Sequence, residues 1–99
     1  MKILALDHVR PGVTMDDIAP HLKDEARHAW QNYGNGLFRE LYFRGDRPGA
    51  VVIMECTDLD EAHAIMKKLP LVRKGLIELT FIPLGPFVHF ASLFEPSHN

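Results

Sequence analysis

With 99 residues, of which 46% are hydrophobic and 24% charged, the chain has the composition of one small globular domain. Its 13 acidic and 11 basic residues give a formal net charge of −2, which disfavours nucleic-acid binding, because that function depends on a basic surface. A single cysteine, Cys56, excludes an internal disulfide, and no apolar run approaches the roughly 20 residues of a membrane span. Since the N-terminus also lacks the pattern of a signal peptide, we expect a cytoplasmic protein.

The first predicted elements are a strand over residues 3–9, which a turn at residues 10–12 ends, and a helix that begins at Thr14. An acid follows Thr14 three residues later, as in a capping box, and apolar residues recur at helical spacing as far as Tyr33. Pro20 lies inside this pattern and removes one helical hydrogen bond. It therefore predicts a kink or a short separate first turn.

Residues 37–44 and 50–56 are predicted to form two strands of a hairpin around the turn 45–49, which contains glycine and proline. We expect Phe43 to face Val51 across this hairpin. The same register places opposite charges together as a cross-strand ion pair, Arg39 with Glu55. It also divides the side chains between two faces, one with Arg39, Leu41, Phe43, Val51, Ile53 and Glu55, the other with Glu40, Tyr42, Arg44, Val52, Met54 and Cys56.

A second capping box at Thr57 starts a helix whose apolar stripe continues to Leu69, and Pro70 ends that helix. The last predicted strand covers residues 76–84. The order β-α-β-β-α-β predicts an α+β, ferredoxin-like fold, a four-stranded antiparallel sheet with two helices on one face. We expect the helix-covered face to hold Leu4, Leu6 and His8 with Tyr42 and Met54.

Residues 1–84 would form this domain, and residues 85–99 would form an apolar C-terminal arm that needs a surface on which to dock. The sheet face without helices should carry apolar side chains, which a monomer rarely leaves uncovered. We therefore expect a homodimer or a higher homo-oligomer, with the arm reaching across a neighbour. Folding of the arm over its own helices is the alternative. The residues expected on the open face include Leu41, Phe43, Val51 and Ile53.

The segment Leu69-Pro70-Leu71, followed by strand residues 76–80, resembles muconolactone isomerase and its relatives in the dimeric α+β barrel superfamily. In that family a leucine-proline-leucine motif likewise ends the second helix and leads into the last strand. The hairpin 42–49 and the tail after Pro83 depart from the isomerase, and none of its catalytic residues matches a position here. The resemblance implies a cofactor-independent enzyme. The superfamily also contains cofactor-free monooxygenases, haem-binding members and proteins without known activity.

The candidate catalytic residues are His8, Glu40 and Tyr42. An imidazole can move a proton in either direction near neutral pH, and Glu40 and Tyr42 stand two residues apart on one strand, so they point the same way. A carboxylate in apolar surroundings becomes a useful acid or base, and a phenol can stabilise an enolate. Arg39 is a candidate anchor for a substrate carboxylate. Each also has a structural explanation: a hydrogen-bonded strand-end histidine, an exposed polar strand, and the ion pair of Arg39 with Glu55.

Two further groups of residues lie on the first predicted helix. Trp30 and Tyr33, one turn apart, would line a pocket for a planar substrate or pack in the core. His21, Glu25 and His28 share a helix face in a charged stretch that is typical of solvated surface, so no metal is expected there. The remaining histidines fit no pattern: His63, His89 and His98.

These residues favour an enzyme without a cofactor that transfers a proton on a small organic acid or lactone, with His8 as the base. The first alternative is a cofactor-free monooxygenase of polyphenolic substrates, which would use Trp30 and Tyr33. The second is a non-catalytic, small-ligand-binding oligomer. For an enzyme we expect His8, Glu40 and Tyr42 to meet around one concave space, and for a binding protein we expect them to point to separate surfaces.

Overall fold

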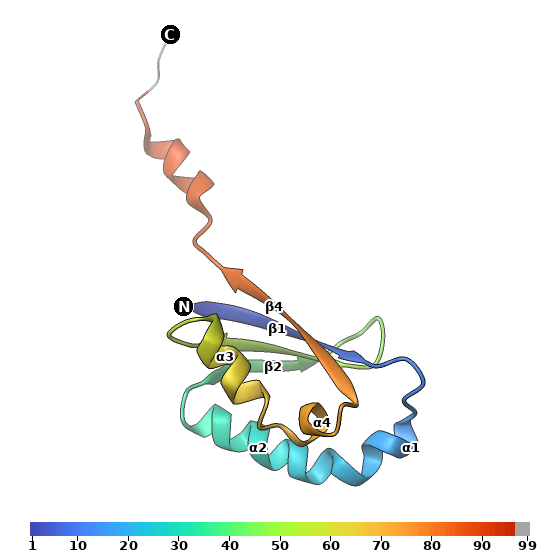
Figure 1. Cartoon of the computed structure of the whole chain (residues 1–99). Helices are drawn as coiled ribbons and strands as arrows, with labels where there is room; N and C mark the ends of the chain where they lie inside the picture. The colour runs from blue at the N-terminus through green and yellow to red at the C-terminus, as the bar shows by residue number, and fades with distance from the viewer. Residues whose placement is uncertain (97–99) are drawn as a thin grey trace.

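A four-stranded antiparallel sheet with helices on one face forms the body of the protein in a computed structural model that describes residues 1–96 (Figure 1). The order across the sheet is β2-β3-β1-β4, and every neighbouring pair is antiparallel. This arrangement confirms the predicted ferredoxin-like fold. The strands are β1 (Lys2–Val9), β2 (Phe38–Phe43), β3 (Ala50–Glu55) and β4 (Ile77–Leu84).

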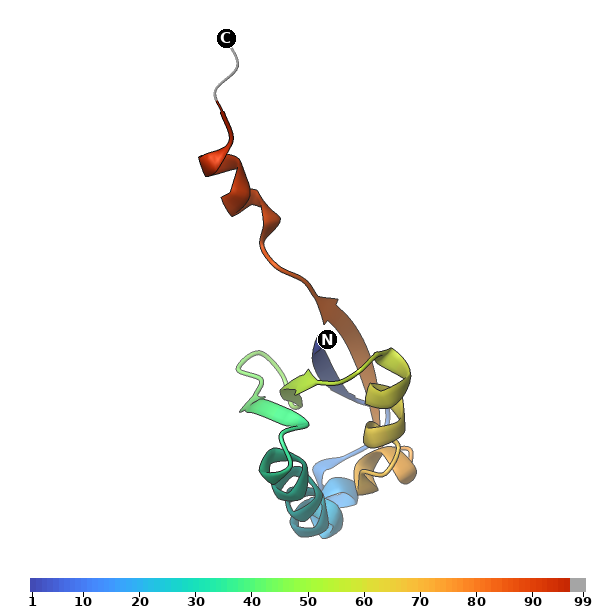
Figure 2. The same ribbon diagram turned by 90° about the vertical axis from the view of Figure 1, so that its left-hand side faces the viewer.

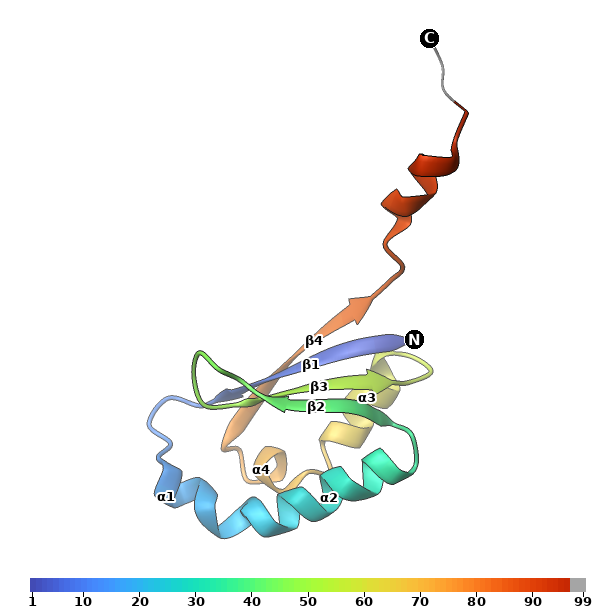
Figure 3. The same ribbon diagram turned by 180° about the vertical axis from the view of Figure 1, so that it is seen from behind.

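The first helical segment divides at Pro20, as predicted. Thr14 caps α1 (Met15–Ile18) through a complete capping box with Asp17, and the 3-10 turn η1 (Ala19–His21) contains the proline. The main helix α2 (Leu22–Gly34) then runs beneath the sheet (Figure 3). The chain therefore changes direction at Pro20 without leaving helical geometry, because proline is tolerated in the first turn of a new helix.

The second helical segment begins and ends differently from the prediction. Asp58, not Thr57, is the N-cap of α3 (Leu59–Met66), and its carboxylate accepts the amide of Glu61 at 2.9 Å. Pro70 does not simply end this segment; it opens a further one-turn helix, α4 (Pro70–Arg73). A proline suits the first helical position because its fixed φ is helical and no amide is needed there.

The hairpin register is shifted by one residue from the expected one. Phe43 pairs with Ala50 and Tyr42 with Val51, and a β-bulge follows between Phe38 and Glu40. The reason is the loop length, since the amide of Arg44 bonds the carbonyl of Gly49 at 2.9 Å and leaves four loop residues instead of five. A one-residue shift moves every side chain of a strand to the other face. Leu41 and Phe43 thus lie on the helix side with Val52, and Glu40 and Tyr42 on the open side.

The expected facing of β1 is also wrong. Ile3 and Ala5 are fully buried beneath the helices and pair with Met54 and Val52. Leu4, Leu6 and His8 therefore lie on the open face, and so does Tyr42; only Met54 of the expected set faces the helices. Alternation could not decide this point, because β1 carries apolar residues in both phases.

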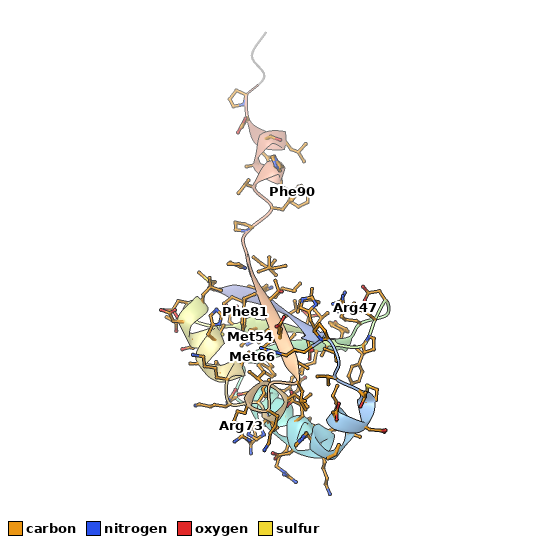
Figure 4. The ribbon with its side chains drawn as sticks, turned by 45° about the vertical axis from the view of Figure 1, so that its right-hand side comes forward. Arg47, Met54, Met66, Arg73, Phe81 and Phe90 are labelled. Atoms are coloured by element: carbon orange, nitrogen blue, oxygen red, sulfur yellow. The ribbon has the colours of Figure 1, made fainter. Side chains whose placement is uncertain are left out.

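The core lies between the sheet and α3. Met54 of β3 and Met66 of α3, both buried, lie close together in Figure 4. Cys56 is buried and its pKa is raised by burial, as expected of an unreactive core thiol. The buried cluster consists of Ile3, Ala5, Phe38, Val52, Met54, Cys56, Ala62, Met66 and Leu69.

Two apolar surfaces remain uncovered. One is the open face of the sheet, and the other is the segment after β4, where the 3-10 helix η2 (Val88–Phe94) stands clear of the body in each view (Figures 1 and 2). No helix among residues 1–96 is long and apolar enough to cross a membrane. The predicted arm, 85–99, is described as far as residue 96; its last three residues, with His98, lie outside the described residues.

Candidate functional site

A cavity of about 580 Å³ lies between the sheet and α2. Helix α2 contributes one face to it, at the spacing i, i+3, i+4, i+7, i+8 and i+11, although none of its 13 residues is buried. An amphipathic helix whose apolar face is not buried leaves space beneath it. The residues that α2 contributes are Leu22, Glu25, Ala26, Ala29, Trp30 and Tyr33.

Small residues keep the cavity open. Ala5 and Ala50 form part of its floor on β1 and β3, and Ala26 and Ala29 face them from α2. Larger side chains at these positions would fill the space, as Met54 and Met66 do beside α3. The cavity therefore follows from a local change in side-chain volume within an otherwise continuous core.

Asp7 is the most unusual residue of this cavity. It follows Ile3 and Ala5 on the inner side of β1, and its Oδ1 is buried without a hydrogen-bond partner within residues 1–96. Burial, and secondly the nearby Glu25 carboxylate, raise the pKa of Asp7 from its ordinary 3.8 to about 6; the Ala50 amide and the Arg44 guanidinium oppose the rise. The group can therefore release or accept a proton close to neutral pH.

Glu25 is the second carboxyl of the cavity, on α2. One of its oxygens, Oε1, accepts the backbone amide of Leu71 in α4 at 3.1 Å. Burial raises the pKa of Glu25, and the bond from Leu71 reduces the effect. Glu25 thus has a partner on α4, whereas Asp7 Oδ1 has none among the described residues, and the charge of Glu25 acts on Asp7 across the cavity.

The β2–β3 hairpin fits tightly against Asp7. Gly49 adopts φ +149°, and a Cβ on it would lie 2.5 Å from the carbonyl oxygen of Asp7. Arg44, whose side chain is 12% exposed, holds Asp46 with two hydrogen bonds of 2.9 and 2.7 Å. Only glycine permits this close approach, so the sequence of the hairpin fixes the position of Asp7.

Trp30 and Tyr33 form an exposed wall of the cavity. Their rings stack with centroids 5.9 Å apart, and the side chains are 73% and 51% exposed. Both belong to the lining, so the structure places them at a pocket rather than in the core. Planar side chains with this freedom suit contact with a flat ligand.

The four polar residues singled out from the sequence lie on the open face or its edge. The Tyr42 hydroxyl donates to Glu40 Oε1 at 2.8 Å, which raises the pKa of Tyr42. His8 is separate: its Nε2 lies 3.1 Å from Thr80 Oγ1, and Arg44 Nη1 lies 3.4 Å from its Nδ1. Of the three catalytic candidates only Tyr42, at the edge strand, touches the cavity, so they do not surround one concave space.

Arg39 does not form the expected ion pair. Within residues 1–96, Glu55 instead lies 3.8 Å from the N-terminal ammonium group. Arg39 and Glu55 border a smaller, polar hollow of the open face, away from the cavity, together with Lys2, Glu40 and Ile53. An anchoring role for Arg39 in the cavity would need a large movement of β2.

Sequence reasoning did not select Asp7, and it considered Glu25 only as a metal ligand. The available signal was that Asp7 shares a strand face with the apolar Ile3 and Ala5. The other face of the strand carries Leu4 and Leu6 and is equally apolar, so the sequence did not show which face is buried. The described part of the chain contains no group of three His, Cys, Asp or Glu residues placed to hold a metal. His28, for example, bonds the carbonyl of Asp24 through Nδ1 at 3.0 Å.

Residues 1–83 match the model of the YCII-related domain, which covers most of the chain. The chain belongs to the YCII-related domain family. Among solved structures it is similar to 5-chloro-2-hydroxyhydroquinone dehydrochlorinase (TftG) from Burkholderia phenoliruptrix AC1100, in complex with 2,5-dihydroxybenzoquinone. The TM-score is 0.66 at 19% identity, over 90% of this chain and 98% of that chain. No curated protein is similar in sequence.

Membership of the YCII-related family agrees with the predicted dimeric α+β barrel superfamily at the level of fold. It gives no support to a closer kinship with muconolactone isomerase. At 19% identity the structural similarity to the dehydrochlorinase likewise shows a common fold, with nearly equal chain lengths.

Proposed function

We propose that this YCII-related protein is an enzyme that transfers a proton on a small, uncharged, planar molecule bound in the cavity, with Asp7 as the general acid and base. The observation that carries the proposal is the unpartnered, buried Asp7 carboxyl oxygen in a mostly apolar cavity, with a pKa of about 6 for Asp7. An ionisable group in such a setting is costly to a fold and typical of a catalytic site.

The charge of the cavity supports an uncharged substrate. Among residues 1–96, the only ionisable side chains in its lining besides two tyrosines are Asp7 and Glu25, and none of these lining residues is a lysine, arginine or histidine. A substrate carboxylate would meet two like charges in the lining, and the Arg44 guanidinium that acts on Asp7 lies outside the lining and is paired with Asp46. The organic acids considered from the sequence are therefore poor candidates, and phenols, quinones and lactones without a carboxylate fit better. The ligand in the dehydrochlorinase structure, 2,5-dihydroxybenzoquinone, is a flat ring. It supports only the planar shape of the substrate, because its hydroxyls are vinylogous acids that ionise below neutral pH.

The chemistry needs one group with two protonation states. The Asp7 carboxylate takes a proton either from a C–H beside a carbonyl, which leaves an enolate, or from a phenol O–H, which leaves a phenolate. It then returns the proton to another atom of the same molecule. Such a step requires no electron acceptor and no cofactor. The isomerisation of an unsaturated lactone, as implied by the resemblance to muconolactone isomerase, consists of the same two transfers.

Proton transfer can be measured without knowing the natural substrate. Exchange of acidic C–H for deuterium in D2O, followed by NMR, is expected for one or more uncharged cyclic ketones, phenols or lactones. We expect Asp7→Asn to lower the exchange rate about 100-fold or more, since a lost general base costs a factor of 10² to 10⁴. Asp60→Asn, an exposed carboxylate in the first turn of α3, is the matched control.

Two outcomes would contradict this assignment. The first is that His8→Gln lowers the exchange rate more than Asp7→Asn does. The base would then be His8, which lies on the open face and not in the cavity. Binding of the same ligands without exchange by the native protein would identify a non-catalytic binding protein instead.

We further propose that the open face is covered by a second copy. Its apolar side chains include Ile82 and Leu84, which are 44% and 38% exposed, beside Leu4, Leu6, Val51 and Ile53. Light scattering should then give a mass of about twice the 11.2 kDa of one chain. A constant mass of one chain at micromolar concentration would refute this assembly.

A further inference from the structure

The isolated chain exposes far more surface than its mass requires. A compact 11.2 kDa monomer exposes about 5,700 Å², whereas this chain exposes 7099 Å², about 1,400 Å² more. Its radius of gyration is 17.1 Å, against about 13 Å for a compact chain of this length. The excess exceeds the roughly 800 Å² that each partner contributes to a standard dimer interface.

Much of this surface belongs to the arm, residues 85–96. Its apolar side chains are 64–86% exposed, and Phe90 projects from a segment that touches no part of the body (Figure 4). A 3-10 helix of seven residues is long for its kind and is not stable by itself in water. The exposed apolar residues of the arm are Phe87, Val88, Phe90, Leu93 and Phe94.

A second uncovered set of apolar residues borders the cavity. We call this set the cavity rim: Met15, Trp30, Tyr33 and Phe43, which are 56%, 73%, 51% and 91% exposed. With these side chains open to water, the wall that they form has no cover on its outer side. A site for proton transfer works best when bulk water is excluded.

We propose that the arm of a second copy docks on the cavity rim, against Trp30 and Tyr33, and supplies the missing cover. The proposal deepens the function proposed above, because the site would be incomplete in one chain. Each chain carries one arm and one rim, so a symmetric dimer closes both cavities and leaves no arm free.

The topology disfavours docking of the arm on its own rim. β4 lines the cavity only with Ile77 and Leu79, and Leu84 lies about 17 Å further along the strand at 3.3 Å per residue. β4 and β2 are opposite edges of the sheet. The arm would therefore have to reverse direction after Leu84 and cross the whole sheet.

A second copy can be reached directly. If two open faces meet about a two-fold axis along the strands, β4 of one copy lies opposite β2 of the other. Tyr33 is in the last turn of α2, which ends at Gly34, shortly before β2 begins at Phe38. Three extended residues and seven residues of 3-10 helix span about 24 Å. The path crosses two layer spacings, from sheet to sheet and from the partner's sheet to its α2, or roughly 20 Å at about 10 Å each, so η2 can pass the partner's sheet edge to its Trp30 and Tyr33.

Trp30, the single tryptophan, reports directly on docking. We expect the emission of the full-length protein to shift to longer wavelength when it is diluted below the dimer dissociation constant. The variant with Phe90→Ser and Phe94→Ser should show the long-wavelength emission at every concentration. Glu95→Gln, an exposed polar change in the same arm, is the control and should behave as wild type.

Cross-linking identifies which chain provides the arm. Phe94→Cys and Tyr33→Cys are made in separate proteins, mixed, and treated with a short bismaleimide; buried Cys56 stays unreactive. A product that contains one chain of each variant is expected. A double variant that cross-links only within itself at 11 kDa, or Trp30 emission that ignores the arm substitutions, would overturn the proposal.

The two proposals fail in different ways. If the arm docks but Asp7 is not catalytic, Trp30 emission depends on the arm, and Asp7→Asn leaves proton exchange unchanged. If Asp7 is catalytic but the arm lies elsewhere, the Phe90→Ser and Phe94→Ser variant retains ligand affinity, whereas docking predicts a loss of about tenfold.

Discussion

Asp7→Asn should make the protein more stable at neutral and alkaline pH. An acid whose pKa is higher in the folded than in the unfolded chain stabilises the fold below its unfolded pKa, and that contribution is lost as the pH rises through the folded pKa. For a rise from 3.8 to about 6, the full loss is about 3 kcal/mol between pH 4 and 6. Solvent screening of the partly exposed carboxyl reduces it to about 1–2 kcal/mol.

Thermal unfolding followed by circular dichroism from pH 4 to 9, at one fixed protein concentration, measures this effect. At pH 8 the Asp7→Asn variant should melt about 5–12 °C above wild type, and at pH 4 the two should nearly coincide. Asp17 and Asp46, whose pKa values are lowered by hydrogen bonds in the fold, act at lower pH and are present in both proteins, so they cancel in the difference.

Parallel stability profiles for the two proteins from pH 4 to 8 would refute the reasoning. They would mean that Asp7 is solvated in solution and that the cavity is not dry enough to perturb it. A gain in stability on removing a residue needed for activity is the usual sign of a strained functional group.

Three other substitutions test neighbouring features. Glu25→Gln keeps an acceptor for the Leu71 amide but removes a charge that raises the pKa of Asp7, so the acidic limb of the pH–rate profile should move to lower pH. An unchanged limb would show that the charge of Glu25 does not affect the titration of Asp7. Gly49→Ala should cost about 2–3 kcal/mol in denaturant unfolding because its Cβ meets the Asp7 carbonyl, whereas Gly45→Ala, with open space around it, should cost under 1 kcal/mol. Met54→Ala should cost about 2–5 kcal/mol by the same measurement, and an equal cost for exposed Met15→Ala would contradict the placement of the core.

Local chemistry in the sequence determined the elements and their order. A capping threonine with Asp17, a proline that divides the first helix, and a turn rich in glycine and proline act within a few residues of themselves. Their effects do not depend on the rest of the chain. The ferredoxin-like topology followed, because two crossovers and one hairpin leave few arrangements.

The facing of β1 was decided only by tertiary structure, and the register of the hairpin depends on both its own loop and a tertiary contact. Both phases of β1 are apolar, and the choice of Ile3, Ala5 and Asp7 for the inner side depends on how they fit Met54, Val52 and the helices. The hairpin slipped by one residue because Gly49 closes a four-residue loop against Asp7. The contacts of Gly49 with Asp7 and of β1 with β3 join segments more than 35 residues apart, which no local pattern encodes.

The candidate site shows the same division. Trp30 and Tyr33 could be selected from helical spacing, since an aromatic pair one turn apart shares a face in any helix. Asp7 could not, because what distinguishes it is the burial of its Oδ1 without a hydrogen-bond partner among residues 1–96. That burial depends on α2, which is separate from β1 in the sequence. Desolvation is a property of the assembled fold, and it changes an ordinary strand aspartate into a group that can transfer protons near neutral pH.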